Sequence, residues 1–293
     1  MKIEIINENS LIRLSDLLKM KVSKKFYRRI KFLNIPIYVN GIVTPLYKEV
    51  KEGDKINFEI IDEKDIEWPL YESKIDIVYE DSNYLIINKR ENLLSIPTKA
   101  EPKSVYQEAL YYLKSTNQEL NVSILNRLDK ETSGLMVIAK NRIAANNLSP
   151  THLKMERKYL CMVDGILEEK SGRIVNYIKR DNDSNKRIAT NIEEADSKIA
   201  ISNYRVIKED LKNNTSILEF VLETGRTHQI RVHTSYLGHP IIGDKMYGKR
   251  TSDIMYLHSY YVKYYDEFKK EYTEVLVYPK WWNDEEKAWF RFT

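Results

Sequence analysis

The stretch that most constrains this chain is residues 124–140, ILNRLDKETSGLMVIAK. It gathers four charged residues, Arg127 and Asp129 among them, before a turn at Thr132-Ser133-Gly134 and an apolar run. This succession mounts a carboxylate on the edge of a sheet, and loops held by a rigid scaffold are where chemistry usually sits. The plain alternative is a charged surface loop that enters a core strand. The rest of the chain decides between the two.

Length and composition exclude several classes of protein. The 293 residues suffice for one sizeable core and a small additional domain. No apolar run approaches the roughly 20 residues of a membrane span, and the N-terminal MKIEIINENS lacks the apolar core of a signal peptide. The single cysteine, Cys161, excludes an internal disulfide and a multi-cysteine metal site. We therefore expect a cytoplasmic protein that does not contact a membrane.

The positive charge is concentrated near the N-terminus. Residues 1–62 contain twelve basic and eight acidic residues, so the net charge of +4 lies there and the remainder is neutral. Within 13–31 there are eight basic residues and one acid, Asp16. This local excess favours contact with a polyanion, because neutralising phosphates releases counterions. An ordinary solvated helix face is the alternative.

The pattern of residues 1–62 predicts a small α+β domain. Residues 13–20 form one short amphipathic helix, and Ser23 caps a second, whose apolar face is Phe26, Ile30 and Leu33. The dipeptide Asn40-Gly41 between β-branched residues predicts a tight hairpin. A turn at Glu52-Gly53-Asp54 then leads into a strand over 55–61.

This order of elements resembles the S-four type RNA-binding domain. The likeness covers about fifty residues, in particular the basic second helix, Val39-Asn40-Gly41 and the stretch Glu52–Ile56. The resemblance implies binding to structured RNA by shape and phosphate contacts. The phosphate-binding candidates are the basic residues of the second helix, Lys24, Lys25, Arg28, Arg29 and Lys31.

Polar residues 63–75, which include Pro69, are expected to be a linker. Residues 76–293 then form the large domain. Strands are expected at 84–88, 135–139, 158–163, 199–206, 217–222 and 230–233, and helices from Ser104, within a capping box, and over 142–148. Many strands with few helices predict an α+β domain built on a large, mostly antiparallel sheet.

Three chemistries find no support in the motifs. His228 and His233 lie five positions apart, a separation that would place them on opposite faces of a strand, and no HExxH pattern is present, so no metal site is expected. A loop that binds nucleotide phosphates is not expected, because neither GxxxxGK[ST] nor GxGxxG is present. Catalysis by a Cys or Ser nucleophile has little support. Cys161 lies in an expected strand of alternating pattern, and Ser133 lacks the GxSxG motif of a nucleophile elbow. An aspartate held by arginine remains, with Asp129 as the carboxylate and Arg226 or Arg231 reaching it from a distant segment. A salt bridge that only stabilises the domain is the alternative.

The residues Asn126–Leu135, NRLDKETSGL, resemble the signature of the RluA family of pseudouridine synthases, usually His-Arg-Leu-Asp followed by Thr-Ser-Gly. Further stretches follow in the family's order: Glu156–Tyr159 with Val163-Asp164-Gly165, then Thr224–His233, Gly238–Asp244 and Leu257-His258. The likeness spans most of residues 76–279. It implies the pseudouridine synthase fold and the isomerisation of a uridine within RNA, with neither a metal nor a redox cofactor.

The resemblance also implies a role for four residues. Asp129 matches the catalytic aspartate, Arg231 the arginine that pairs with it, and Tyr159 the tyrosine that stacks on the target uracil. A base inside an RNA helix must be flipped out before it can react. Arg127 matches the arginine that is inserted into the vacated space. Arg226 and His228 are expected to serve local structure.

Two stretches depart from the family pattern. Asn126 stands where the family usually has histidine, so a supporting contact is expected to differ. Lys89-Arg90-Glu91-Asn92 replaces Lys-Pro-x-Gly, which predicts the loss of a rigid turn at the rim of the site. Neither departure removes a group needed for the chemistry.

Three functions compete at this point. We expect a monomeric RNA pseudouridine synthase that acts on ribosomal RNA, most of all the large subunit's, with transfer RNA as the alternative substrate. A non-catalytic RNA-binding or ribosome-assembly protein would not need Asp129, Tyr159 and Arg231 together. A glycoside hydrolase would need two carboxylates across the sugar, and only Asp129 lies in a motif.

Overall fold

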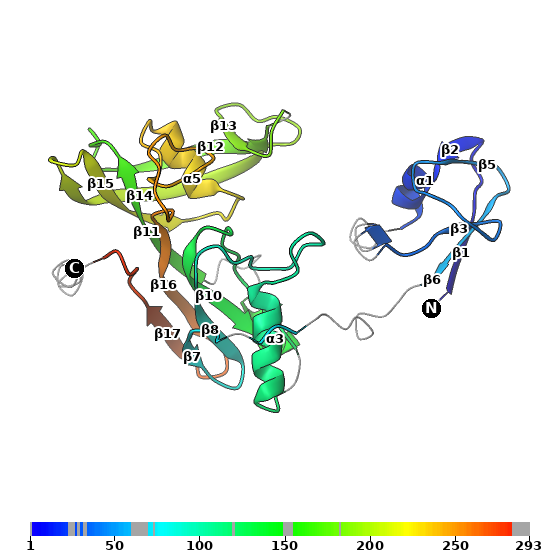
Figure 1. Cartoon of the computed structure of the whole chain (residues 1–293), viewed down its shortest axis with the longest axis horizontal. Helices are drawn as coiled ribbons and strands as arrows, with labels where there is room; N and C mark the ends of the chain where they lie inside the picture. The colour runs from blue at the N-terminus through cyan, green and yellow to red at the C-terminus, as the bar shows by residue number, and fades with distance from the viewer. Residues whose placement is uncertain are drawn as a thin grey trace. The chain divides into compact units, whose positions relative to one another are not determined.

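A computed structural model describes residues 2–22, 27, 30–31, 34–59, 70–72, 74–118, 121–148, 155–181 and 183–282. The chain divides into two compact units, Met1–Pro69 and Leu70–Thr293 (Figure 1). The division falls within the expected linker, most of which lies outside the described residues. No helix in the described part of the chain is long and apolar enough to cross a membrane.

The first unit contains one described helix and two small sheets. One sheet has the strand order β1-β6-β3-β4, and the other pairs β2 with β5. The predicted hairpin is confirmed, since Asn40 and Gly41 both have positive φ, at 51° and 83°. The N-terminal strand β1 was not predicted. The elements are β1 (Lys2–Ile6), β2 (Leu11–Arg13), α1 (Leu14–Lys21), β3 (Tyr38–Val39), β4 (Ile42–Val43), β5 (Glu49–Lys51) and β6 (Lys55–Glu59).

Only part of the predicted second helix can be compared with the structure. Tyr27, Ile30 and Lys31 are helical, and Ile30 is buried in the core of this unit beside residues of α1. Lys31 is exposed. Four of the predicted RNA-binding residues lie outside the described residues, namely Lys24, Lys25, Arg28 and Arg29.

The second unit is built on a sheet of eleven strands, which confirms the expected fold class (Figure 1). Its order is β13-β12-β14-β15-β11-β16-β10-β8-β7, with β17 added to β16 and β9 to β10. Among the described strands the pairing is antiparallel except between β10 and β16. The strands are β7 (Ile77–Glu80), β8 (Tyr84–Lys89), β9 (Ser123–Ile124), β10 (Ser133–Ala139), β11 (Met155–Asp164), β12 (Ser171–Arg180), β13 (Arg187–Thr190), β14 (Lys198–Asp210), β15 (Thr215–Leu222), β16 (Leu257–Asp266) and β17 (Glu271–Leu276).

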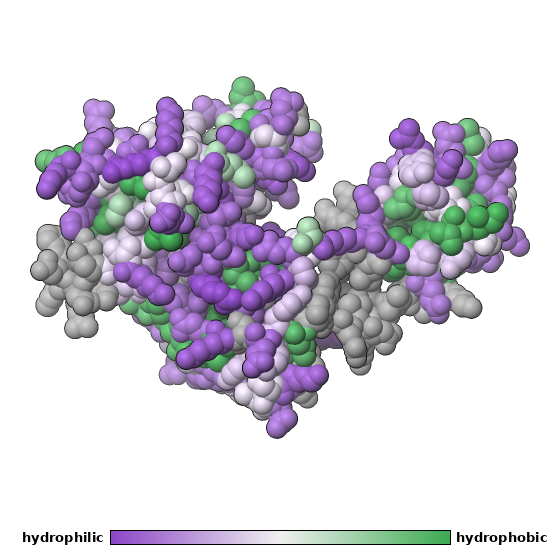
Figure 2. Space-filling model, in the orientation of Figure 1, coloured by the Kyte–Doolittle hydropathy of each residue, from purple (hydrophilic) through white to green (hydrophobic). Residues whose placement is uncertain are grey.

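Strands β8 and β10 are buried on both faces, which is why they read as continuous apolar runs. Leu85 and Met136 join one core cluster, whereas their neighbours Ile86 and Leu135 join another on the opposite face. Because α3 (Val105–Ser115) packs Ala109 into the first cluster and α4 (Arg142–Asn147) packs into the second, the two helices cover opposite faces. Figure 2 shows that hydrophilic side chains dominate the visible surface of this unit.

The described helices α3 and α4 differ in how their first turns are capped. Asn141 caps α4 as its side chain accepts a hydrogen bond from the Ala144 amide at 2.8 Å, and this helix was predicted. Ser104 is the N-cap of α3, but the expected capping box is wrong. Its hydroxyl hydrogen-bonds to the Gln107 side chain and makes no bond to the helix backbone.

The predicted strand over 230–233 is wrong, because this segment belongs to the helix α5 (Gln229–Tyr236). The sequence Ile-Arg-Val-His alternates apolar and polar residues and so imitates a strand. In the structure all four side chains are buried, so the helix carries no clear polar face for a periodicity analysis to detect. The consequence is functional, since α5 carries Arg231 towards Asp129.

Candidate active site

The loop that bears Asp129 is fixed at its start by Asn126. The buried Asn126 amide donates to the Leu135 carbonyl at 3.1 Å and accepts from the Val137 amide at 2.7 Å, both on β10. The position therefore needs one donor and one acceptor, and asparagine supplies both. A positive charge is not required for this contact, which accounts for the departure from histidine.

Three further contacts hold the backbone on either side of Asp129. The Ser95 hydroxyl donates to the Leu128 carbonyl at 2.6 Å and accepts from the Leu128 amide at 3.0 Å. The Thr132 amide donates to the Asp129 carbonyl at 3.2 Å. The buried ammonium group of Lys89 donates to the Lys130 carbonyl at 3.0 Å. A loop held at so many points presents its carboxylate in a fixed position.

The turn after Lys89 is formed despite the absence of proline and glycine, so the predicted loss of a rigid turn is wrong. Asn92 adopts a positive φ of 62°, which asparagine tolerates better than most residues. Arg90 binds the Glu108 carboxylate on α3 at both guanidinium ends, at 3.0 and 2.6 Å. Burial lowers the pKa of Lys89 to about 7, whereas the charges of Asp129 and Glu131 act to raise it.

Helix α5 begins at a point anchored to β14 by Gln229. The Gln229 amide donates to the Ile201 carbonyl at 3.0 Å and the Ser202 hydroxyl at 2.9 Å. Its oxygen accepts from the Arg226 amide and the Thr224 hydroxyl, both at 2.9 Å. This buried amide sets the start of the helix and hence the direction in which Arg231 points.

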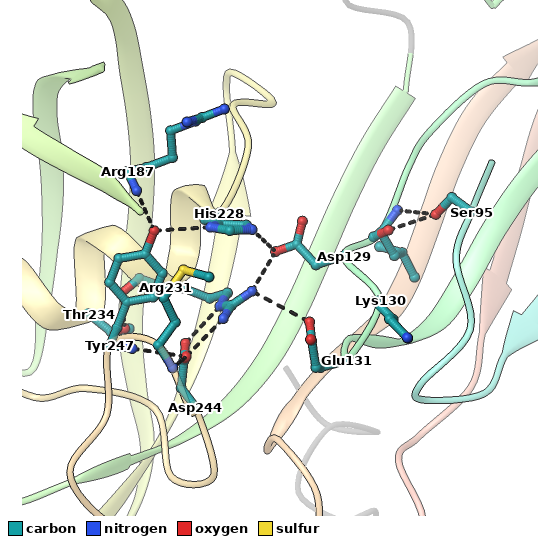
Figure 3. A network of polar contacts seen from close by, with 12 residues as sticks. Ser95, Asp129, Lys130, Glu131, Arg187, His228, Arg231, Thr234, Asp244 and Tyr247 are labelled. Carbon is teal, nitrogen blue, oxygen red and sulfur yellow. Dashed lines mark hydrogen bonds and ion pairs between the residues drawn. The ribbon is translucent and has the colours of Figure 1, made fainter. Parts of the chain in front are cut away.

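Arg231 joins two carboxylates (Figure 3). Its Nε and Nη2 donate to Asp244 at 2.7 and 2.8 Å, while Nη1 lies 3.4 Å from Oδ2 of Asp129 and 3.7 Å from Glu131. The Arg231 side chain is 4% exposed and that of Asp129 is 24% exposed. A buried cation thus supports a carboxylate that solvent or a substrate can still reach.

Asp244 lies on a loop attached to β11. The Ile242 amide donates to the Met162 carbonyl at 3.0 Å, and the Asp164 amide to the Pro240 carbonyl at 3.0 Å. Gly243, directly before Asp244, has a φ of +78°, and a Cβ there would meet the Ile254 carbonyl oxygen at 1.9 Å, so no other residue fits. Burial acts to raise the pKa of Asp244, but Arg231 and two backbone amides outweigh it, so the pKa is lowered.

His228 and Tyr247 complete the surroundings of Asp129 (Figure 3). His228 Nε2 lies 4.0 Å from Asp129 Oδ2, and its Nδ1 lies 3.0 Å from the Tyr247 hydroxyl. The Tyr247 ring also lies beneath the Arg231 guanidinium, 5.3 Å from its central carbon. His228 therefore lies next to the Asp129 carboxylate, a contact that the expected role in backbone positioning or local structure did not include.

Tyr159 lies on β11, directly after an irregularity in the pairing of β11 with β16 between Lys158 and Tyr159. Such bulges redirect side chains near active sites. The ring is 5% exposed and belongs to the core cluster that also contains Leu128, next to Asp129 in sequence. Burial raises the pKa of Tyr159, and the Asp129 charge contributes to the rise.

The two remaining arginines behave differently. Arg127 is exposed, and its side chain makes no hydrogen bond or ion pair with the residues that the structure describes. Arg226 donates through Nε to the Ile199 carbonyl at 2.8 Å, which ties it to β14 and away from Asp129. Of the two arginines proposed to reach Asp129, the structure therefore brings Arg231 to it.

A cavity of about 320 Å³ opens beside this network. Its lining includes the acidic Glu131 and the basic Arg231, Lys186 and Lys245. Acidic and basic groups thus meet where a polar, anionic substrate could enter. Within the described part of the chain, no three His, Cys, Asp or Glu side chains are grouped to hold a metal ion.

Two residues of this site received no role from the sequence. In the sequence Asp244 stood out only as the last residue of the Gly238–Asp244 stretch. Its distance along the chain from Arg231 gave no sign that the two residues form a pair. Tyr247 follows it by three positions and had no signal of its own. The argument that treated His228 and His233 as residues of a strand is wrong, since His228 is the N-cap residue before α5 and His233 lies within this helix. His233 Nε2 lies 3.1 Å from Asn176 Oδ1.

The sheet with an arginine-supported aspartate at its centre defines a class, the pseudouridine synthases. Human RNA pseudouridylate synthase domain containing 1 superposes with a TM-score of 0.60 at 24% identity, covering 73% of this chain and 87% of that one. Human RNA pseudouridylate synthase domain containing 4 gives 0.59 at 19% identity, covering 74% and 93%. These likenesses concern the fold alone.

Sequence comparison gives the family. The family model described as RNA pseudouridylate synthase matches residues 83–236. The RNA pseudouridine synthase YjbO of Bacillus subtilis is 32% identical, over 86% of this chain and 90% of the relative. Ribosomal large subunit pseudouridine synthase D of Buchnera aphidicola is 39% identical, over 72% and 67%. The chain belongs to the RluA-type family of RNA pseudouridine synthases, which are isomerases.

Proposed function

We propose that the protein isomerises uridine to pseudouridine in large-subunit ribosomal RNA and that Asp129 is the catalytic carboxylate. The observation that carries the proposal is the partly exposed Asp129 carboxylate, supported by Arg231, which Asp244 fixes in turn. The guanidinium orients the Asp129 carboxylate, and a carboxylate can act as a nucleophile or a base.

The reaction is balanced without any added atom. The N1–C1′ bond breaks, the uracil turns, and a C5–C1′ bond forms, after which the hydrogen on C5 leaves and N1 gains a proton. Asp129 acts at the uridine while Arg231 stabilises its charge. The cavity bordered by Arg231 and Glu131 offers a place for the flipped nucleotide.

Tyr159 and Arg127 have complementary roles in this proposal. Tyr159 provides an aromatic surface for the uracil, and its place in the core keeps the ring fixed. Arg127 is exposed and lies two residues before Asp129. Its side chain enters the space that the flipped uridine leaves in the stack of RNA bases. Unstacking a base costs a few kcal/mol, and a planar guanidinium replaces part of the lost contact.

The N-terminal unit serves as an S-four type RNA-binding domain in this proposal. Its helix α1 precedes its Asn40-Gly41 hairpin, as in the expected order. The basic residues of its second helix, Lys31 among them, contact phosphates. This unit supplies affinity, whereas the second unit performs the chemistry.

The choice of ribosomal RNA rests on the relatives. Large subunit pseudouridine synthases D of Haemophilus ducreyi, Buchnera aphidicola and Yersinia pestis are 36%, 39% and 36% identical over about three quarters of this chain. Transfer RNA is the second candidate substrate, and a non-catalytic RNA-binding role is the alternative to an enzyme.

The test is a map of pseudouridines in ribosomal and transfer RNA from cells with and without the gene. Loss of specific large-subunit sites, restored by the wild type but not by Asp129→Asn, is the expected result. Asp164→Asn is a matched control, because Asp164 is also a partly exposed aspartate beside an arginine, 3.5 Å from Arg250, and should restore the sites. An unchanged map would refute the enzymatic role. Loss of sites in transfer RNA alone would show that transfer RNA, and not ribosomal RNA, is the substrate.

A further inference from the structure

His228 stands in a conformation that needs an explanation. It is the residue before α5 and has a φ of 59°, in the left-handed region that few non-glycine residues adopt. This backbone conformation accompanies an imidazole that lies between Asp129 and Tyr247 (Figure 3). Its side chain is 16% exposed, so most of the ring is enclosed.

The hydrogen bonds around Tyr247 suit one tautomer of the imidazole. The Tyr247 hydroxyl accepts the Arg187 amide hydrogen at 2.7 Å, and it has a hydrogen of its own to donate to His228 Nδ1, 3.0 Å away. Nδ1 is then an acceptor, and the hydrogen of the neutral ring is on Nε2. Burial lowers the pKa of His228, which favours this neutral form, and the Asp129 charge acts against it.

Two donors consequently point at one oxygen. Arg231 Nη1 lies 3.4 Å and His228 Nε2 lies 4.0 Å from Asp129 Oδ2. Both distances are long, as is common for catalytic hydrogen bonds before the substrate binds. The other oxygen, Oδ1, has no hydrogen-bond partner among the described residues and faces no such donor.

We propose that His228 is a positioning residue that, as an uncharged Nε2–H donor fixed by Tyr247, holds Oδ2 of Asp129 and leaves Oδ1 to act on the uridine. This inference rests on the proposed function. Arg231 supplies charge, and His228 supplies direction without a second positive charge that would bind the anionic carboxylate too tightly. Arg187 starts β13, so this strand supports the orientation of the imidazole.

A pair of substitutions separates this role from a backbone role. Asparagine adopts positive φ readily, so His228→Asn suits the backbone but is too short to donate to Asp129. His228→Gln is less suited to positive φ, yet its amide reaches the place of Nε2. A backbone role favours the asparagine variant, whereas the proposed donor role favours the glutamine variant.

The assay uses the full chain and total RNA labelled with [5-³H]uridine from cells that lack the gene. Reattachment through C5 releases tritium, which is followed in single turnovers. We expect His228→Gln to stay within a few-fold of the wild type. His228→Asn should lose about tenfold or more in rate, the effect of one hydrogen bond to a charged group. RNA affinity and the unfolding midpoint of the asparagine variant should equal those of the wild type.

Tyr247→Phe tests the second half of the proposal, because it keeps the ring beneath Arg231 but removes the hydroxyl that fixes the tautomer. It should lower the single-turnover rate in the wild type and have less effect in the His228→Gln background, since the two residues act through one contact. Equal rates for the asparagine and glutamine variants, or a faster asparagine variant, would overturn the inference while leaving the enzyme active. A wild type that releases no tritium would overturn the proposed function and this inference together.

Discussion

Arg231 and Asp244 form a buried pair with two hydrogen bonds, Nε to Oδ2 at 2.7 Å and Nη2 to Oδ1 at 2.8 Å. Arginine and carboxylate meet in this way when orientation matters as much as attraction. The pair uses two of the guanidinium nitrogens and leaves Nη1 for Asp129. The geometry of the Asp129 carboxylate thus depends on a second aspartate, Asp244, that does not touch it.

Replacing Asp244 with alanine should strongly destabilise the fold. The change leaves the buried Arg231 cation with only the longer contacts to Asp129 and Glu131, at 3.4 and 3.7 Å. Breaking a buried pair costs about 3 to 5 kcal/mol in the free energy of unfolding. Urea unfolding followed by circular dichroism measures it. Glu223→Ala is the control, because Glu223 forms a similar two-bond pair with Arg173 at the surface and should change stability little. Equal effects of the two substitutions would contradict the structural role of Asp244.

The sequence sufficed to predict what is local. The hairpin at Asn40-Gly41 and the helix over 142–148 depend on a few adjacent residues, and both are observed. The Asp129 loop was found from its motif, because the signature is contiguous. Burial on both faces made the strands β8 and β10 recognisable as apolar runs.

What the sequence could not predict is set by distant contacts. The segment Ile230–His233 was assigned to a strand because burial on all sides of α5 removes the helical period. Asp244 and Arg231 are joined by a loop whose course depends on the contact of Ile242 with β11. The Tyr247 hydroxyl contacts His228 only after the loop that carries Tyr247 and the segment before α5 have adopted their positions.

Substituting Asn126 with alanine should destabilise the protein and lower its activity together. The change leaves the Leu135 carbonyl and the Val137 amide buried without their partner, at about 1 to 3 kcal/mol for each group. The loop that carries Asp129 begins here, so kcat should fall in the fraction that remains folded. Urea unfolding and single-turnover assays measure the two effects. Wild-type stability in this variant would show that the asparagine clamp is dispensable.

His258 should make the folded state sensitive to acid. The buried ring accepts from Ser133 at Nδ1, at 2.8 Å, and donates from Nε2 to the Val277 carbonyl at 3.0 Å. Burial lowers the pKa of His258 to about 4. As the pH falls from about 6.5 to 4, the unfolded chain binds a proton that the folded chain does not, so stability is lost across this window, by up to about 3 kcal/mol.

The measurement for His258 is the difference between the wild type and His258→Gln at each pH. Because the pKa of His233 is also lowered to about 4 by burial, the wild type alone would report on both rings. We expect the variant to lose less stability than the wild type between pH 6.5 and 4. Parallel curves would mean that His258 does not contribute.

Arg127→Ala should slow catalysis without weakening the fold. The side chain is exposed and not bonded to the described residues, so its removal should change the free energy of unfolding by no more than about 0.5 kcal/mol. If Arg127 fills the space left by the flipped uridine, the single-turnover rate should fall by about tenfold or more on a duplex that contains the mapped uridine, while RNA affinity changes less. The loss should shrink when the same uridine is supplied in a single-stranded oligonucleotide, where there is no stack to open. Arg142→Ala, an exposed arginine on α4, serves as the control and should leave both rates unchanged. An equal loss on both substrates would place Arg127 in binding or chemistry and remove it from base flipping.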